Sequence, residues 1–232
     1  MSAIMFLLLI LTRKIRLIEV GDAVQNEMQK IYDRFAETYD KNRNLFDMTE
    51  VIGDFYKRIN CRKGHLLDLG CGAGEPFPAY FIQQGWQVTG VDFSAKMLEL
   101  ARRYQPDMKT ILADIGEVEF PDQQFNAVTA IYCLFHIACE KHEEIFQKIY
   151  RWLAPRGKFL FTYATKEYTG AEVFQGYKEF MGEQLFYSHT TPDQLTAALK
   201  AAGFSIESAQ YRCIGGETFL WMTAAKPFCS GR

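Results

Sequence analysis

The sequence predicts a single-domain α/β fold: a seven-stranded, mostly parallel sheet with helices on both faces and an antiparallel C-terminal hairpin. Two observations predict it. Short apolar runs alternate with amphipathic helix patterns between residues 65 and 163, as in parallel strands joined by crossover helices. Beyond the last helix pattern, two strand patterns are separated only by the turn 214–217, so these strands must pair antiparallel.

The elements follow from hydrophobic periodicity. Apolar residues spaced by three and four predict helices over 23–39 and 47–59. The alternating region is then predicted to contain strand 65–69, helix 77–84, strand 87–91, helix 95–104, strand 109–112, strand 127–132, helix 143–153 and strand 158–163. Helix 191–202 ends at Gly203, a helix-stop residue. Strands 206–213 and 218–224 form the hairpin.

Composition limits the function classes. A chain of 232 residues, 48% of them hydrophobic, can bury one substantial core. Its formal net charge of −2 gives no general attraction to phosphate backbones, so no nucleic-acid partner is expected. The six cysteines lack metal-ligand spacing, which predicts reduced thiols, no metal site and a cytoplasmic location. The composition gives no prediction of oligomeric state.

The N-terminal residues 1–22 form an apolar segment of unknown role. Its apolar run, Ile4 to Leu11, is too short to span a bilayer and its charges follow the run instead of preceding it. No membrane span is therefore expected.

The stretch HLLDLGCGAGEP places Gly70, Gly72 and Gly74 directly after an apolar strand that carries Asp68. Missing side chains let the backbone come close to a ligand. The glycine spacing differs from the dinucleotide pattern G-x-G-x-x-G, and the carboxylate of Asp68 suits a ligand with an ammonium group better than a pyrophosphate.

Two further carboxylates follow the next two strands. Asp92 can accept hydrogen bonds from both hydroxyls of a ribose, and Asp114 can accept one from the exocyclic amine of adenine. The three carboxylates together predict an adenosine that carries an ammonium group and no phosphate.

An ordered set of motifs resembles the class I S-adenosylmethionine-dependent methyltransferases, in the small-molecule branch described as methyltransferase type 11 or UbiE-like. The motifs are LLDLGCGAGEP, VTGVDFSAKMLELAR, ADIGEVEFPDQQFNAV and LAPRGKFLF, within residues 30–226. The resemblance implies a Rossmann-like fold and S-adenosylmethionine as cofactor. It also implies one domain over 23–226, with lid helices in 23–60 and an acceptor-side insertion at 166–190. Asn126 and Arg156 depart from the family pattern.

The resemblance implies a set of cofactor-binding residues. Asp68 and the glycine loop would surround the methionine part, Asp92 would hold the ribose, and Tyr39 would close over the cofactor from the lid helix. The full expected set is Tyr39, Asp68, Gly70, Cys71, Gly72, Gly74, Asp92, Phe93, Met97, Asp114, Ile115 and Tyr132. Phe93 and Met97 would sandwich the adenine, although simple core packing explains them as well.

The acceptor would bind beside the fourth strand, which runs into IYCLFHI, because ligands gather at the carboxyl ends of strands in open α/β sheets. His136 is the candidate catalytic residue, either as a general base or as a residue that shapes the pocket. The expected acceptor pocket contains Tyr32, His136, Tyr187 and His189. Glu217 and Trp221 of the hairpin are further candidates.

These observations predict methyl transfer by in-line displacement to an oxygen, sulfur or nitrogen atom of a small-molecule acceptor. The alternative is a cofactor-binding module or regulatory subunit of the same fold without turnover. A nicotinamide-dependent oxidoreductase is a third reading, but the glycine loop lacks the dinucleotide spacing. The fourth strand also lacks Asp/Asn-Pro-Pro-Tyr, which disfavours methylation of planar amino groups.

Overall fold

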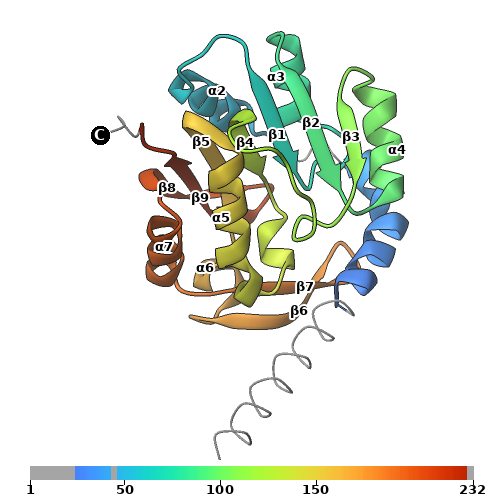
Figure 1. Ribbon diagram of the computed structural model, residues 1–232. Helices are drawn as coiled ribbons and strands as arrows, with labels where there is room; N and C mark the ends of the chain where they lie inside the picture. The colour runs from blue at the N-terminus through green and yellow to red at the C-terminus, as the bar shows by residue number, and fades with distance from the viewer. Residues whose placement is uncertain (1–23, 43–45, 229–232) are drawn as a thin grey trace, which may run out of the picture.

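The computed structural model describes residues 24–42 and 46–228 (Figure 1). The predicted N-terminal segment 1–22 lies outside these residues. The strands are β1 (His65–Leu69), β2 (Gln87–Asp92), β3 (Lys109–Leu112), β4 (Phe125–Ala130), β5 (Leu153–Tyr163), β6 (Phe174–Phe180), β7 (Glu183–His189), β8 (Ser205–Ile214) and β9 (Glu217–Ala225). The helices are 24–42, α2 (Thr49–Arg58), α3 (Phe77–Gln83), α4 (Ala95–Tyr104), α5 (His142–Trp152), α6 (Lys166–Thr169) and α7 (Pro192–Ala201), with short 3₁₀ turns η2 (Leu134–His136) and η3 (Cys139–Lys141).

The main sheet has seven strands in the order β3-β2-β1-β4-β5-β9-β8. The first five are parallel, and β9 pairs antiparallel with both β5 and β8. The residues Gly215 and Gly216 join β8 to β9 with φ of 64° and 85°, the positive values that a tight hairpin turn requires. The predicted fold class, a Rossmann-like and mostly parallel sheet with a C-terminal antiparallel hairpin, is confirmed.

Helices cover both faces of this sheet (Figure 1). Residues of α5 and α7 share one buried cluster with the side chains of β4 and β5. On the opposite face, α2, α3 and α4 pack on β1 and β2. Burial on both faces explains why the central strands are nearly continuous apolar runs in the sequence. No helix among residues 24–42 and 46–228 is long and apolar enough to cross a membrane.

The segment 166–190 contains structure that the periodicity did not indicate. It forms the short helix α6 and a separate two-stranded antiparallel sheet of β6 and β7, joined through Met181 and Gly182 at φ of 48° and 86°. Burial alternates along β6, but two inward positions are Gly176 and Lys178, so the apolar alternation is obscured in the sequence.

The parallel strands bring the carboxyl ends of β1, β2 and β4 to one edge of the sheet. Figure 1 shows β6 and β7 running across the molecule below this edge, next to helix 24–42. The helix and the hairpin are held together by a cluster that includes Met28, Ile31 and Phe186. Ligands of open α/β sheets bind at this edge.

Candidate active site

A cavity of about 730 Å³ opens at this edge of the sheet. Its walls come from three sources: the loops after β1, β2, β3 and β4 together with α3, helix 24–42 with the start of α2, and the β6–β7 and β8–β9 hairpins. Ligand pockets commonly hold about 300–1,000 Å³. The cavity is therefore large enough for a cofactor with a small second ligand.

The glycine loop forms the floor of the cavity. The backbone N–H groups of Gly70 and Cys71 both donate to the carbonyl of Val91, at 2.8 and 3.0 Å, which turns the chain sharply after β1. Gly70 has φ of 69°, and a Cβ there would lie 2.5 Å from Cβ of Cys133. Gly72 has φ of 50° and faces open space, where a Cβ would approach only the hydroxyl of Tyr39, at 3.9 Å. The absence of a side chain at Gly72 leaves room for a ligand.

Gly74, a predicted cofactor-binding residue, does not line the cavity. A Cβ at this position would lie 3.0 Å from Cγ of Gln105, so the third glycine allows the loop to pack closely on the end of α4.

Two buried carboxylates lie beside the loop. Asp68 accepts a hydrogen bond from Thr129 Oγ1 at 2.5 Å. Asp92 accepts from the N–H groups of Gly72 at 2.8 Å and Ser94 at 2.9 Å. Burial raises the pKa of Asp68 to about 7 and that of Asp92 to about 6, although these hydrogen bonds oppose the change.

Among the described residues, no lysine or arginine lines the cavity. Buried carboxylates without cationic partners are disfavoured in their charged form. A ligand that brings positive charge and hydroxyl donors would satisfy them.

The part of the cavity at the ends of β2 and β3 is apolar. Phe93, Met97, Ala113 and Ile115 line it, and Met97 packs against the buried residues of helix 24–42. Asp114, by contrast, does not line the main cavity. It borders a neighbouring cavity of about 400 Å³ that shares Phe93 and Ala113 with the first, and its Oδ1 accepts from Gly116 N at 2.6 Å.

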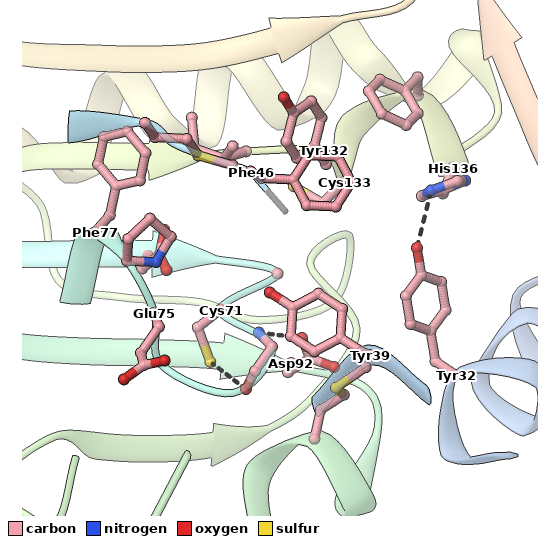
Figure 2. Close-up of a pocket in the computed structure, with 18 of the residues that line it drawn as sticks. Tyr32, Tyr39, Phe46, Cys71, Glu75, Phe77, Asp92, Tyr132, Cys133 and His136 are labelled. Atoms are coloured by element: carbon pink, nitrogen blue, oxygen red, sulfur yellow. Dashed lines mark hydrogen bonds between the residues drawn. The ribbon is translucent and has the colours of Figure 1, made fainter. Parts of the chain in front are cut away.

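His136 lies at the opposite wall, where the hydroxyl of Tyr32 points toward it (Figure 2). The Nδ1 atom of His136 lies 2.6 Å from the carbonyl oxygen of Phe186. A carbonyl can only accept, so Nδ1 carries the proton and Nε2 accepts from Tyr32 Oη at 3.0 Å. Burial lowers the pKa of His136 to about 4, so the imidazole is neutral at pH 7.

The other predicted tyrosines also line the cavity. Tyr39 extends from helix 24–42 toward the glycine loop, and burial raises its pKa to about 12. Tyr132 lies two residues beyond β4, which ends earlier than predicted, and has φ of 54°. Its buried hydroxyl has no hydrogen-bond partner within the described chain. Tyr187 lies 3.0 Å from Tyr168, hydroxyl to hydroxyl.

Two predicted acceptor-pocket candidates lie elsewhere. His189 does not line the cavity; its Nε2 is 2.7 Å from Thr169 Oγ1, because β7 turns this side chain toward α6. Trp221 is buried in the core against Tyr132. The cavity lining also contains aromatic rings that periodicity assigned to no site, among them Phe46, Phe135 and Phe219.

Comparisons with known proteins agree with this geometry. Residues 67–161, which run from within β1 through the glycine loop to within β5, match the family model of a methyltransferase domain. The chain is 26% identical to demethylmenaquinone methyltransferase of Thermotoga maritima, over 81% of this chain and 92% of that protein. It is 24% identical to phosphoethanolamine N-methyltransferase of Plasmodium falciparum, over 77% of this chain and 67% of that protein. Matches to Tropheryma whipplei relatives span 49% of their length.

Solved structures show the same fold. An S-adenosylmethionine-dependent methyltransferase from Mesorhizobium loti is similar with a TM-score of 0.63 at 21% identity, covering 77% of this chain and 97% of that one. The 1,6-didemethyltoxoflavin-N1-methyltransferase of Burkholderia thailandensis, solved with S-adenosylhomocysteine, is similar with a TM-score of 0.63 at 22% identity, covering 85% and 87%. The motifs, the sheet order and the matched methyltransferase domain together support a class I S-adenosylmethionine-dependent methyltransferase, an enzyme that uses S-adenosylmethionine as its cofactor.

Proposed function

We propose that the enzyme transfers the methyl group of S-adenosylmethionine to an oxygen, sulfur or nitrogen atom of a small molecule, in the cytoplasm. One observation carries this proposal: the cavity continues from the glycine loop to a set of aromatic side chains beneath helix 24–42 and the β6–β7 hairpin. A second ligand can therefore lie beside the cofactor in an enclosed space. The absence of lysine and arginine from the described cavity lining argues against a nucleic-acid acceptor.

The residues around the glycine loop fit the cofactor. We assign Asp92 to the ribose hydroxyls, because its two oxygens keep free lone pairs beyond the two backbone N–H groups they accept. Asp68 is assigned to the ammonium group, and its raised pKa reflects a carboxylate without a cation. Phe93, Met97 and Ile115 are assigned to the adenine, with Asp114 at its outer edge.

The cofactor supplies an electrophilic methyl group on a positively charged sulfur. Catalysis then depends mainly on alignment and on exclusion of water, which in favourable cases lower a barrier by about 7–11 kcal/mol. Helix 24–42 provides Tyr39 on the cofactor side and Tyr32 on the acceptor side. This arrangement supports the assignment of residues 23–60 as a lid and of 166–190 as the acceptor-side insertion.

His136 fits a positioning function better than a general base. Its lone pair on Nε2 is already engaged by Tyr32, and its low pKa makes it a weak base. We propose that the Tyr32–His136 hydrogen bond fixes helix 24–42 over the acceptor.

Turnover tests this proposal. The purified protein is incubated with S-adenosylmethionine and a panel of small amines, phenols and thiols, and formation of S-adenosylhomocysteine is followed by chromatography. The wild type should turn over at least one class, and Asp92→Ala should not. If the wild type binds the cofactor, turns over no small molecule and co-purifies with a protein partner, the regulatory-subunit alternative replaces this proposal.

A further inference from the structure

The acceptor end of the cavity is built from stacked aromatic rings. Phe135 stacks on Phe219 with centroids 4.9 Å apart and on Tyr187 at 5.4 Å. Tyr132 meets Phe219 edge-on at 5.2 Å. All four side chains line the cavity, and we call them the aromatic wall. Because Phe135 is stacked on both Phe219 and Tyr187, these rings largely cover one another's faces, and the wall offers an apolar surface to the hydrocarbon part of an acceptor.

One carboxylate lies at this wall and is not explained by the cofactor. Of the acidic residues that line the cavity, Asp68, Glu75 and Asp92 belong to the glycine loop and the adjoining strand ends. Asp47 is at the exposed start of α2, where it accepts from Thr49 N at 3.0 Å. Glu217 remains, at the first position of β9 and two residues from Phe219.

Glu217 is half-buried and has two polar neighbours, Tyr168 and Lys178. Burial raises its pKa, and hydrogen bonding from Tyr168 and the charge of Lys178 oppose that change. Lys178 itself does not line the cavity. Its ammonium group donates to the carbonyl of Tyr168 and lies 4.3 Å from the centre of the Tyr168 ring.

A buried hydroxyl at the same wall also lacks a partner. Tyr132 Oη is shielded from solvent and makes no hydrogen bond within residues 24–42 and 46–228. Tyr132 and Glu217 both line the cavity, and burial together with the charge of Glu217 raises the pKa of Tyr132. Buried polar groups are normally hydrogen-bonded, which indicates that a polar ligand group belongs beside this hydroxyl.

We propose that the acceptor is an organic amine that binds with a positive charge and carries no phosphate or carboxylate group, with its cation beside Glu217 and its apolar part against the aromatic wall. This inference rests on the proposed methyltransferase function and adds the charge class of its acceptor. An anionic acceptor would meet Glu217 with no lysine or arginine in the described lining to offset the repulsion. The acceptor therefore differs in charge from the phosphoethanolamine in the name of the Plasmodium relative.

Three matched probes test the charge class: 2-phenylethylamine, 2-phenylethanol and 3-phenylpropionate. Each is titrated by calorimetry into protein saturated with S-adenosylhomocysteine. The amine should bind about tenfold more tightly than the alcohol, because only the amine can form a charged hydrogen bond with Glu217, and the carboxylate should bind most weakly. In Glu217→Gln the amine and the alcohol should bind equally. Glu179→Gln, on the exposed side of β6, is the control and should keep the preference of the wild type.

The outcomes separate this inference from the proposed function. If S-adenosylhomocysteine does not bind, the proposed function fails. If S-adenosylhomocysteine binds, three results overturn only the charge class. These are tightest binding of the carboxylate, no binding of the amine, and an amine preference that survives in Glu217→Gln.

Discussion

The hydroxyl of Tyr32 donates to Nε2 of His136 across 3.0 Å, and this hydrogen bond joins helix 24–42 to the turn η2 over the cavity. Its direction is fixed by the other ring nitrogen, which donates to Phe186 on β7. One imidazole thus connects the N-terminal helix, the β6–β7 hairpin and the loop after β4. These three segments enclose the proposed acceptor site.

Replacing Tyr32 with phenylalanine should lower kcat/KM about tenfold, because it removes one hydrogen bond and leaves the buried Nε2 of His136 unsatisfied. Affinity for S-adenosylhomocysteine should change less than about twofold, since Tyr32 contacts the acceptor side. Steady-state kinetics and calorimetry measure the two effects. Tyr177→Phe is the matched control, because it removes an exposed hydrogen bond to Glu27 from the same helix and hairpin. Equal kinetics in the two variants would contradict a special role for Tyr32.

Cofactor affinity should rise with pH between about 5.5 and 7.5. Burial raises the pKa of Asp68 to about 7 and of Asp92 to about 6, so both carboxyls are partly protonated in the free protein. A cationic ligand favours the ionised form and lowers these pKa values, and protons are released on binding. Calorimetry in buffers of different ionisation enthalpy counts these protons. S-adenosylmethionine should show a steeper dependence than S-adenosylhomocysteine, which lacks the sulfonium charge. Proton uptake would show that the carboxylates do not face the cation.

Asp68→Asn should stabilise the ligand-free protein at pH 8 while weakening cofactor binding. The folded pKa of Asp68 lies above the ordinary value of 3.8, so the unfolded chain loses this proton first and stability falls as pH rises from about 4 to 7. The neutral amide in Asp68→Asn does not ionise, so the variant does not lose stability as the pH rises. The melting temperature should rise by about 3 °C or more at pH 8, the shift expected for about 1 kcal/mol, and hardly change at pH 4.5. A lower melting temperature at pH 8 would contradict the raised pKa.

Two glycine substitutions separate backbone strain from crowding. Gly70 and Gly182 both have positive φ, 69° and 86°, which costs a side-chain-bearing residue about 1–2 kcal/mol. A Cβ at Gly70 would also lie 2.5 Å from Cβ of Cys133, whereas one at Gly182 meets nothing within 4 Å. Gly70→Ala should therefore lower the free energy of unfolding more than Gly182→Ala in a denaturant titration. An equal loss would show that the loop adjusts to a methyl group.

The sequence predicted the main sheet well because its signals are local. Alternating strand and helix patterns located β1 to β4 and α3 to α5 within a few residues, and the two glycines at 215–216 fixed the hairpin. It missed β6 and β7 because Gly176 and Lys178 occupy inward positions of β6. The β6–β7 hairpin is determined by packing against the tyrosines and phenylalanines of the acceptor end. Such packing leaves no periodic pattern in the local sequence.

More of the predicted cofactor-binding residues than of the predicted acceptor-pocket residues line the cavity, for the same physical reason. Asp68, Gly72 and Asp92 lie at or just beyond the carboxyl ends of β1 and β2, and parallel strands bring such positions together at one edge. Phe135, Phe219 and Glu217 meet only through the tertiary arrangement of η2 and β9. Likewise, the direction of the His189 side chain depends on the register of β7. The sequence did not predict that register.

Calorimetric titration of the wild type and Asp92→Ala with S-adenosylmethionine, S-adenosylhomocysteine and NADH tests the central claim most directly: that carboxylates at the strand ends hold the cofactor in this cavity. The wild type should bind the first two ligands and not NADH. Asp92→Ala should lose about a hundredfold in affinity for both, as expected for the loss of hydrogen bonds to a charged acceptor. Unchanged affinity in Asp92→Ala would contradict the claim and place the cofactor elsewhere.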